Sequence, residues 1–185
     1  MVSQTDIIPN QQMYAALFNK GEIMFSFSDS ANVVKPPYPF RDRMRIFLAG
    51  SIEMGTAENW QEKVEKALST YRVDIFNPRR DDWNSSWGQS ISDPHFFNQV
   101  TWELDALDAA DIILMYFDPN TKSPISLLEL GLYARSKKLI VVCPDGFWRK
   151  GNVDVVCQRE WIQTYSTIDE AIHEIIHRLG NNENC

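Results

Sequence analysis

From residue 45 onward, short apolar runs alternate along the chain with longer amphipathic stretches. The runs have the length of buried strands, and the stretches between them carry apolar residues at helical spacing. The apolar runs predict strands at 46–50, 73–76, 111–117, 139–143 and 153–156. The amphipathic stretches predict helices at 59–71, 96–109, 124–135 and 168–179.

Regular alternation of strand and helix predicts an α/β domain with a five-stranded, doubly wound parallel sheet and right-handed crossovers. Ligands of such sheets bind in the crevice outside the carboxyl ends of the strands. The segments in which to look for chemistry therefore follow Leu48, Phe76, Phe117 and Cys143.

Residues 1–44 differ from the rest and are interpreted as an N-terminal arm, with the main domain at 45–185. Residues 24–28 alternate between apolar and polar positions, which is typical of one strand. The proline-rich stretch at 35–39 favours extended backbone and excludes a helix. The arm is therefore expected to add one edge strand to the sheet.

The composition is that of a globular chain, because 44% of the 185 residues are hydrophobic and 23% are charged. A net charge of −7 argues against a nucleic-acid polymer as partner, since such binding depends on Lys and Arg. No apolar run reaches the ~20 residues of a membrane span, and no secretory signal is evident at the start. Three cysteines without paired spacing favour a reducing, cytoplasmic location.

The turn after the first strand of the domain begins Gly50-Ser51 and ends at Gly55. Glycine in such a turn lets backbone N–H groups approach a ligand closely, although strand-to-helix turns also contain glycine for backbone reasons alone. The spacing matches neither a P-loop nor the dinucleotide-binding fingerprint.

The turn after the second strand contains two arginines, two aspartates and an indole between Arg79 and Trp83. Guanidinium and indole surfaces suit a phosphate, a carboxylate or a flat heterocycle. The alternative is a salt-bridged loop held in place by its tryptophans.

The helix that follows the third strand presents the sharpest signal. Ser123-Pro124 predicts an N-cap followed by proline at the first helical position. Ser126, Glu129 and Tyr133 then form one polar stripe on an otherwise apolar helix. Because a buried, unpaired carboxylate is costly, Glu129 is interpreted as a group placed for chemistry; a structural glutamate satisfied by its neighbours is the alternative.

The pattern His173-Glu174-x-x-His177 matches the motif of zinc proteases, but only eight residues follow it, with Glu183 as the sole candidate for the third ligand that such a site needs. It is interpreted as part of a plain amphipathic helix. The acidic residues between Glu103 and Asp111 are expected to be mostly a solvated helix face.

Several motifs in order along the chain resemble the nucleoside 2-deoxyribosyltransferase-like family. The resemblance covers about residues 45–179 and rests on the segments 46–52, 77–83, 110–112, 126–131 and 151–157. It implies a flavodoxin-like fold and cleavage of the N-glycosidic bond of 2′-deoxynucleosides or their 5′-monophosphates. It also implies a homodimer or larger homo-oligomer, in which Asn152 is expected to reach the neighbouring subunit.

By the same resemblance, Glu129 is the nucleophile, Ser123 lies where relatives bind a 5′-phosphate, and Glu103 lies where relatives contact the base. Two positions depart from the family pattern: Phe47 replaces a tyrosine, and Glu53 replaces an arginine that binds phosphate in nucleotide-specific relatives. The residues expected to bind substrate are Phe47, Gly50, Ser51, Arg79, Trp83, Ser123, Ser126 and Asn152.

The sequence therefore predicts a two-step displacement in which Glu129 attacks C1′ and a second base or water resolves the glycosyl ester. Glu103 or Asp82 is expected to handle the proton of the leaving base, and the helix N-terminus to keep Glu129 ionised. No metal or organic cofactor is required. The alternatives are a nucleotide or NAD-type N-glycosidase and a non-catalytic nucleotide sensor.

Overall fold

A computed structural model describes residues 30–34, 43–52, 59–79 and 88–182. The strands in these ranges are β1 (Asn32–Val34), β2 (Met44–Gly50), β3 (Val73–Phe76), β4 (Ile112–Tyr116), β5 (Leu139–Val142) and β6 (Gln163–Tyr165). The helices are α2 (Trp60–Leu68), α3 (Pro94–Ala109), α4 (Pro124–Tyr133), α5 (Lys150–Glu160) and α6 (Ile168–Asn182).

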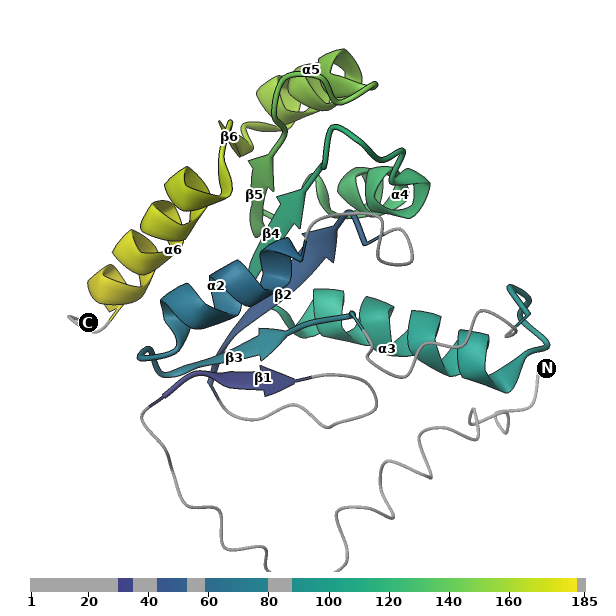
Figure 1. The fold of residues 1–185 in the computed structure, drawn as a ribbon, viewed down its shortest axis with the longest axis horizontal. Helices are drawn as coiled ribbons and strands as arrows, with labels where there is room; N and C mark the ends of the chain where they lie inside the picture. Colours follow the sequence, from purple (N-terminus) through teal and green to yellow (C-terminus); the bar gives the residue numbers. More distant parts are fainter. Residues whose placement is uncertain (1–29, 35–42, 53–58, 80–87, 183–185) are drawn as a thin grey trace, which may run out of the picture.

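The six strands form one all-parallel sheet in the order β1-β3-β2-β4-β5-β6 (Figure 1). Without the edge strand β1, the order β3-β2-β4-β5-β6 is the flavodoxin-like order. The α/β doubly wound fold predicted from the sequence is therefore confirmed. The connections run outward in opposite directions from β2 and β4, which are hydrogen-bonded neighbours. The crevice expected to bind a ligand therefore lies at the carboxyl ends of these two strands.

Helices cover both faces of the sheet: α2 and α6 pack on one face, and α3, α4 and α5 on the other (Figure 1). Successive residues of β2 point to opposite faces, so Ile46 and Leu48 pack with α2 and α6 whereas Phe47 and Ala49 pack with α3. All four side chains are buried. Strands β4 and β5 are apolar and buried on both faces, as strands covered on both sides require.

One predicted strand is wrong. Residues 153–156 belong to helix α5, where Val153 and Cys157 are buried one turn apart and Val155 is exposed. Their burial follows the helical period, which a run of only four residues did not reveal. The strand at this edge of the sheet is β6, whose sequence Gln-Thr-Tyr has no apolar run and was not predicted.

Strand β1 lies within the segment interpreted as the arm and pairs in parallel with β3, so the expected edge strand is present. The strand predicted at 24–28 lies outside the described residues, and the boundary at residue 44 stays a prediction. None of the described helices has the length and apolar character needed to cross a membrane.

Candidate functional site

Gly50 ends β2 beside the backbone of Tyr116 on β4. Its φ is +131°, and a Cβ at this position would lie 2.2 Å from the Tyr116 carbonyl oxygen. Only glycine fits this close approach, which favours the structural interpretation of Gly50 over direct contact with a ligand. The next residue, Ser51, is fixed by its N–H, which donates to Tyr116 O (2.9 Å), and by its carbonyl, which accepts from the Trp60 indole N–H (2.9 Å).

A cluster of three buried hydroxyls occupies the crevice between the ends of β2 and β4. Ser51 Oγ lies 2.6 Å from Ser123 Oγ and 2.8 Å from Thr121 Oγ1. The Asp118 N–H donates to Ser51 Oγ (2.8 Å), and the Thr121 hydroxyl donates to the Asp118 carbonyl (2.9 Å). The loops after β2 and β4 are thus joined immediately before α4. Thr121 was missed from the sequence because a threonine in a polar loop gives no distinctive signal.

Helix α4 begins at Pro124, as predicted, but Ser123 does not cap it with its side chain. Ser123 has a φ of +46°, and its hydroxyl contacts Ser51 and Thr121 instead of the first N–H groups of the helix. Ser123 is therefore the N-cap residue, as predicted, but its side chain makes no capping hydrogen bond because the hydroxyl cluster holds it.

Glu129 is buried in the polar stripe of α4, with 9% of its surface exposed, and Ser126 beside it is also buried. Burial, and to a smaller extent the nearby charge of Glu103, raise the pKa of Glu129 to about 8. This rise runs against the expectation that the helix N-terminus keeps the carboxylate ionised, and desolvation is its largest cause.

Tyr133, the third residue of the stripe, is half-buried and donates its hydroxyl to Asp108 Oδ1 (2.7 Å). Burial and this hydrogen bond to an acidic acceptor raise the pKa of Tyr133. The stripe therefore divides into two parts, with Ser126 and Glu129 in the interior and Tyr133 bonded to the end of α3.

Glu103 on α3 is the second carboxyl group of the site. Burial raises the pKa of Glu103, whereas a hydrogen bond from Gln99 opposes this shift. The Gln99 side-chain amide lies 2.7 Å from Glu103 Oε1 and 3.3 Å from the carbonyl oxygen of Pro78. Sequence reasoning missed Gln99, although its position one turn before Glu103 was a usable signal.

Side-chain contacts hold residues 77–79, the described part of the loop after β3. Asn77 Oδ1 accepts from the Arg79 N–H (2.9 Å), and Asn77 Nδ2 donates to Glu65 Oε1 (2.6 Å). The Arg79 guanidinium donates to Gln61 Oε1 (3.4 Å), which directs this arginine toward α2. Asp82 and Trp83, both expected at the site, lie outside the described residues.

The two remaining expected residues, Phe47 and Asn152, differ in their surroundings. Phe47 is 1% exposed and packs against Trp102 with ring centroids 6.4 Å apart, so its ring belongs to the core. Asn152 is exposed on α5 and lines a hollow between α4 and α5. Within 30–34, 43–52, 59–79 and 88–182 there is no group of His, Cys, Asp and Glu side chains that could hold a metal ion. Glu174 of the His-Glu-x-x-His pattern pairs with Arg178 (2.7 Å).

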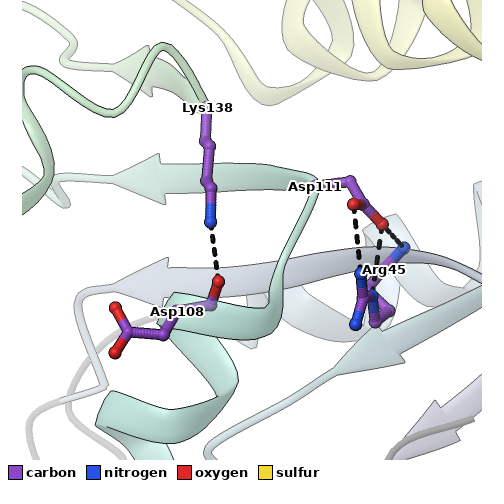
Figure 2. Close-up of polar contacts among 4 residues, drawn as sticks. All are labelled: Arg45, Asp108, Asp111 and Lys138. Atoms are coloured by element: carbon purple, nitrogen blue, oxygen red, sulfur yellow. Dashed lines mark hydrogen bonds and ion pairs between the residues drawn. The ribbon is translucent and has the colours of Figure 1, made fainter.

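Asp111 lies at the opposite, amino-terminal edge of the sheet and has a structural role there. It accepts hydrogen bonds from the Arg45 backbone N–H (2.8 Å) and from the Arg45 guanidinium (3.3 Å), as Figure 2 shows. In the same region Lys138 Nζ donates to the carbonyl oxygen of Asp108 (2.7 Å). Asp111 thus joins the starts of β2 and β4, far from the crevice.

Replacing Asp111 with alanine is expected to lower the free energy of unfolding by about 1–2 kcal/mol, because a backbone N–H and a guanidinium lose their acceptor. Urea titration measures the change. Asp169→Ala is the matched control, since it breaks only the exposed Lys63–Asp169 ion pair and should cost less than about 0.5 kcal/mol. A loss of ligand turnover without a loss of stability in Asp111→Ala would contradict this assignment.

Comparison with known proteins gives one family match and a structural neighbour. The family model described as nucleoside 2-deoxyribosyltransferase like matches residues 43–147. No curated protein sequence matches the chain. A conserved protein from Enterococcus faecalis V583 has a similar fold, with a TM-score of 0.53 and 13% sequence identity over 74% of this chain and 99% of that chain. At this identity the likeness concerns the fold alone, whereas the family match spans more than half of the chain. The chain therefore belongs to the nucleoside 2-deoxyribosyltransferase-like family.

Proposed function

We propose that this protein cleaves the N-glycosidic bond of a 2′-deoxynucleoside, or of its 5′-monophosphate, through a covalent ester with Glu129. The observation that carries the proposal is a pair of carboxyl groups, buried Glu129 on α4 and half-buried Glu103 on α3. Desolvation raises the pKa of both groups, and the charge of Glu103 adds to the rise at Glu129. Desolvated titratable pairs of this kind mark sites of acid, base or nucleophilic chemistry. Family membership supports a nucleoside-type ligand.

In the first step, a carboxylate oxygen of Glu129 forms a bond to C1′ while the C1′–N bond breaks. The bonding electron pair leaves with the base, which takes a proton from Glu103 or Asp82. In the second step, the nitrogen of another base or a water oxygen attacks C1′, the ester breaks, and the incoming nucleophile returns a proton to the same acid. A deoxy sugar suits this route because no 2′-hydroxyl withdraws electrons from the cation-like transition state.

The reacting form has Glu129 ionised and a proton on the acid, Glu103 or Asp82. Desolvation raises the pKa of Glu103 and that of Glu129, the latter to about 8, so Glu129 must lose its proton before it reacts and is then the more basic oxygen nucleophile. The chain's own carboxyl groups thus supply both the nucleophile and the acid, and the proposed steps require no cofactor.

The experiment that tests the proposal is incubation with 2′-deoxynucleosides and their 5′-monophosphates together with a different free base. Formation of a new deoxynucleoside supports transfer, and release of free sugar supports a hydrolytic N-glycosidase. Binding without turnover supports a nucleotide sensor. The sensor has a specific observation in its favour, since Phe47, which replaces the tyrosine of the family pattern, is buried in the core and carries no hydroxyl.

We further propose that the active form is a homodimer or larger assembly that uses the outer face of α4. Ile125, Leu128 and Leu132 lie on this face and are 60–62% exposed. Beside them is a hollow of about 320 Å³, which does not include Glu129 and is lined by Leu127, Leu130, Gly131, Arg149, Asn152, Val153 and Val156. Exposed apolar side chains next to an apolar hollow on the same face suit a self-complementary, two-fold interface.

Leu128→Glu is expected to convert the assembly to monomers, because a buried carboxylate in an apolar interface has no partner. Sedimentation velocity measures the change in mass. Ile91→Glu is the matched control, since Ile91 is 80% exposed and lies before α3, away from this face. A Leu128→Glu protein with unchanged mass would contradict the interface, and so would a monomeric parent protein.

A further inference from the structure

Gln99 is a buried amide that bonds to two different parts of the site. It lies on α3 with 6% of its surface exposed, one turn before Glu103. Its side-chain nitrogen is within hydrogen-bond distance of Glu103 Oε1 (2.7 Å) on the same helix and of Pro78 O (3.3 Å) on the loop after β3. No step of the proposed reaction uses Gln99 directly.

The two contacts fix which way the Gln99 amide points. The Pro78 carbonyl can only accept a hydrogen bond, so the nitrogen of the amide, and not its oxygen, must face it. The second N–H of the same nitrogen is then directed at Glu103 Oε1. The distance of 2.7 Å is at the short end of the range for an amide N–H donating to a carboxyl oxygen.

We infer that Gln99 is a positioning residue that holds the Glu103 carboxyl with Oε1 as a hydrogen-bond acceptor and leaves Oε2 as the oxygen that exchanges a proton with the leaving base. This inference rests on the proposed function. As the C1′–N bond breaks, the proton moves from Glu103 Oε2 to the base nitrogen, and Glu103 becomes a carboxylate. The N–H of Gln99 stabilises that carboxylate, so its hydrogen bond strengthens in the transition state.

The surroundings of Glu103 make this donor important. Glu103 is desolvated, and Gln99 is the group that opposes the rise in the pKa of Glu103. The neighbouring carboxyl group on α4 is Glu129, whose pKa the charge of Glu103 raises. Without the amide N–H, the acid would release its proton less readily to the departing base.

The test compares two leaving groups in Gln99→Met, which keeps the size of the side chain and removes both N–H groups. One substrate is the 2′-deoxynucleoside that the parent protein cleaves fastest, and the other is 4-nitrophenyl 2-deoxyriboside, whose nitrophenolate departs without needing a proton. We expect kcat/KM to fall about tenfold to hundredfold on the nucleoside and less than about threefold on the nitrophenyl substrate. Glu103→Gln should show the same contrast with a larger loss.

Equal losses on both substrates would show a merely structural role and overturn the inference, and so would unchanged rates on both. If the parent protein cleaves neither substrate, the proposed function fails as well. Gln158→Met, at an exposed glutamine of α5, is the matched control and should leave both rates unchanged. If Gln99→Met folds poorly, Gln99→Asn serves instead, because its shorter amide cannot span both acceptors and should give the same contrast.

Discussion

Replacing Glu129 with glutamine is expected to lower kcat by at least about 10³-fold, because the amide keeps the shape of the side chain but cannot form the ester. Initial-rate measurements of base release from a 2′-deoxynucleoside give the change. Binding should persist, since glutamine still fits the buried stripe of α4. In the parent protein, the rate should rise as the pH is raised toward about 8, where the buried carboxyl group ionises.

Glu160→Gln is the matched control for this experiment. Glu160 is a half-buried glutamate at the end of α5 that forms ion pairs with Arg135 and Arg159, and its replacement should leave kcat within about twofold. Base release that survives in Glu129→Gln would contradict the role of Glu129 as nucleophile.

Glu129→Gln is also expected to stabilise the fold at alkaline pH. The pKa of Glu129 is about 8 in the folded protein and near 4.5 in an exposed chain, so the folded state binds the proton more tightly than the unfolded state. This proton stabilises the parent protein fully when the pH is below the pKa of Glu129 in the unfolded chain. The stabilisation is lost as the pH rises toward the pKa of Glu129 in the folded protein. Glutamine remains neutral throughout, and Glu129→Gln should therefore gain as much as roughly 4 kcal/mol over the parent protein between about pH 5 and about pH 9.

Urea unfolding of the variant and the parent protein at several pH values measures this gain. The difference between the two proteins isolates Glu129 from the other carboxyl groups that titrate in the same range. Glu62→Gln, at an exposed glutamate of α2, is the matched control and should follow the parent protein at every pH. A gain of the same size in both variants, or no gain in Glu129→Gln, would show that the Glu129 carboxyl is not desolvated in the fold.

The sequence predicted most of the sheet because its strands are buried on both faces and read as continuous apolar runs. The strand at 73–76 coincides with β3, and the helices at 124–135 and 168–179 overlap α4 and α6. The prediction from apolar runs is wrong at the β6 edge of the sheet. There, a polar strand carries no apolar signal, and the short apolar run of α5 follows a helical period that four residues cannot reveal.

The candidate site was predicted in part. The burial of Glu129 followed from the apolar residues around it on the helix, and the structure confirms it. The exposed apolar face of α4 could not be predicted from the sequence, because the sequence alone does not show which apolar side chains stay uncovered by the rest of the chain. The hydroxyl partner of Ser123 and the two acceptors of Gln99 also depend on contacts between distant loops, which only the fold brings together.

The central claim is that a carboxylate oxygen of Glu129 becomes covalently bonded to C1′ of a deoxyribose. The most direct measurement is mass spectrometry of the intact protein and its peptides after reaction with a 2′-fluoroarabinosyl nucleoside, whose fluorine slows breakdown of the ester. The account predicts a mass gain of one fluorinated sugar, located on the peptide that contains Glu129 and absent from Glu129→Gln. Release of the base without any labelled peptide, or a label on another residue, would contradict it.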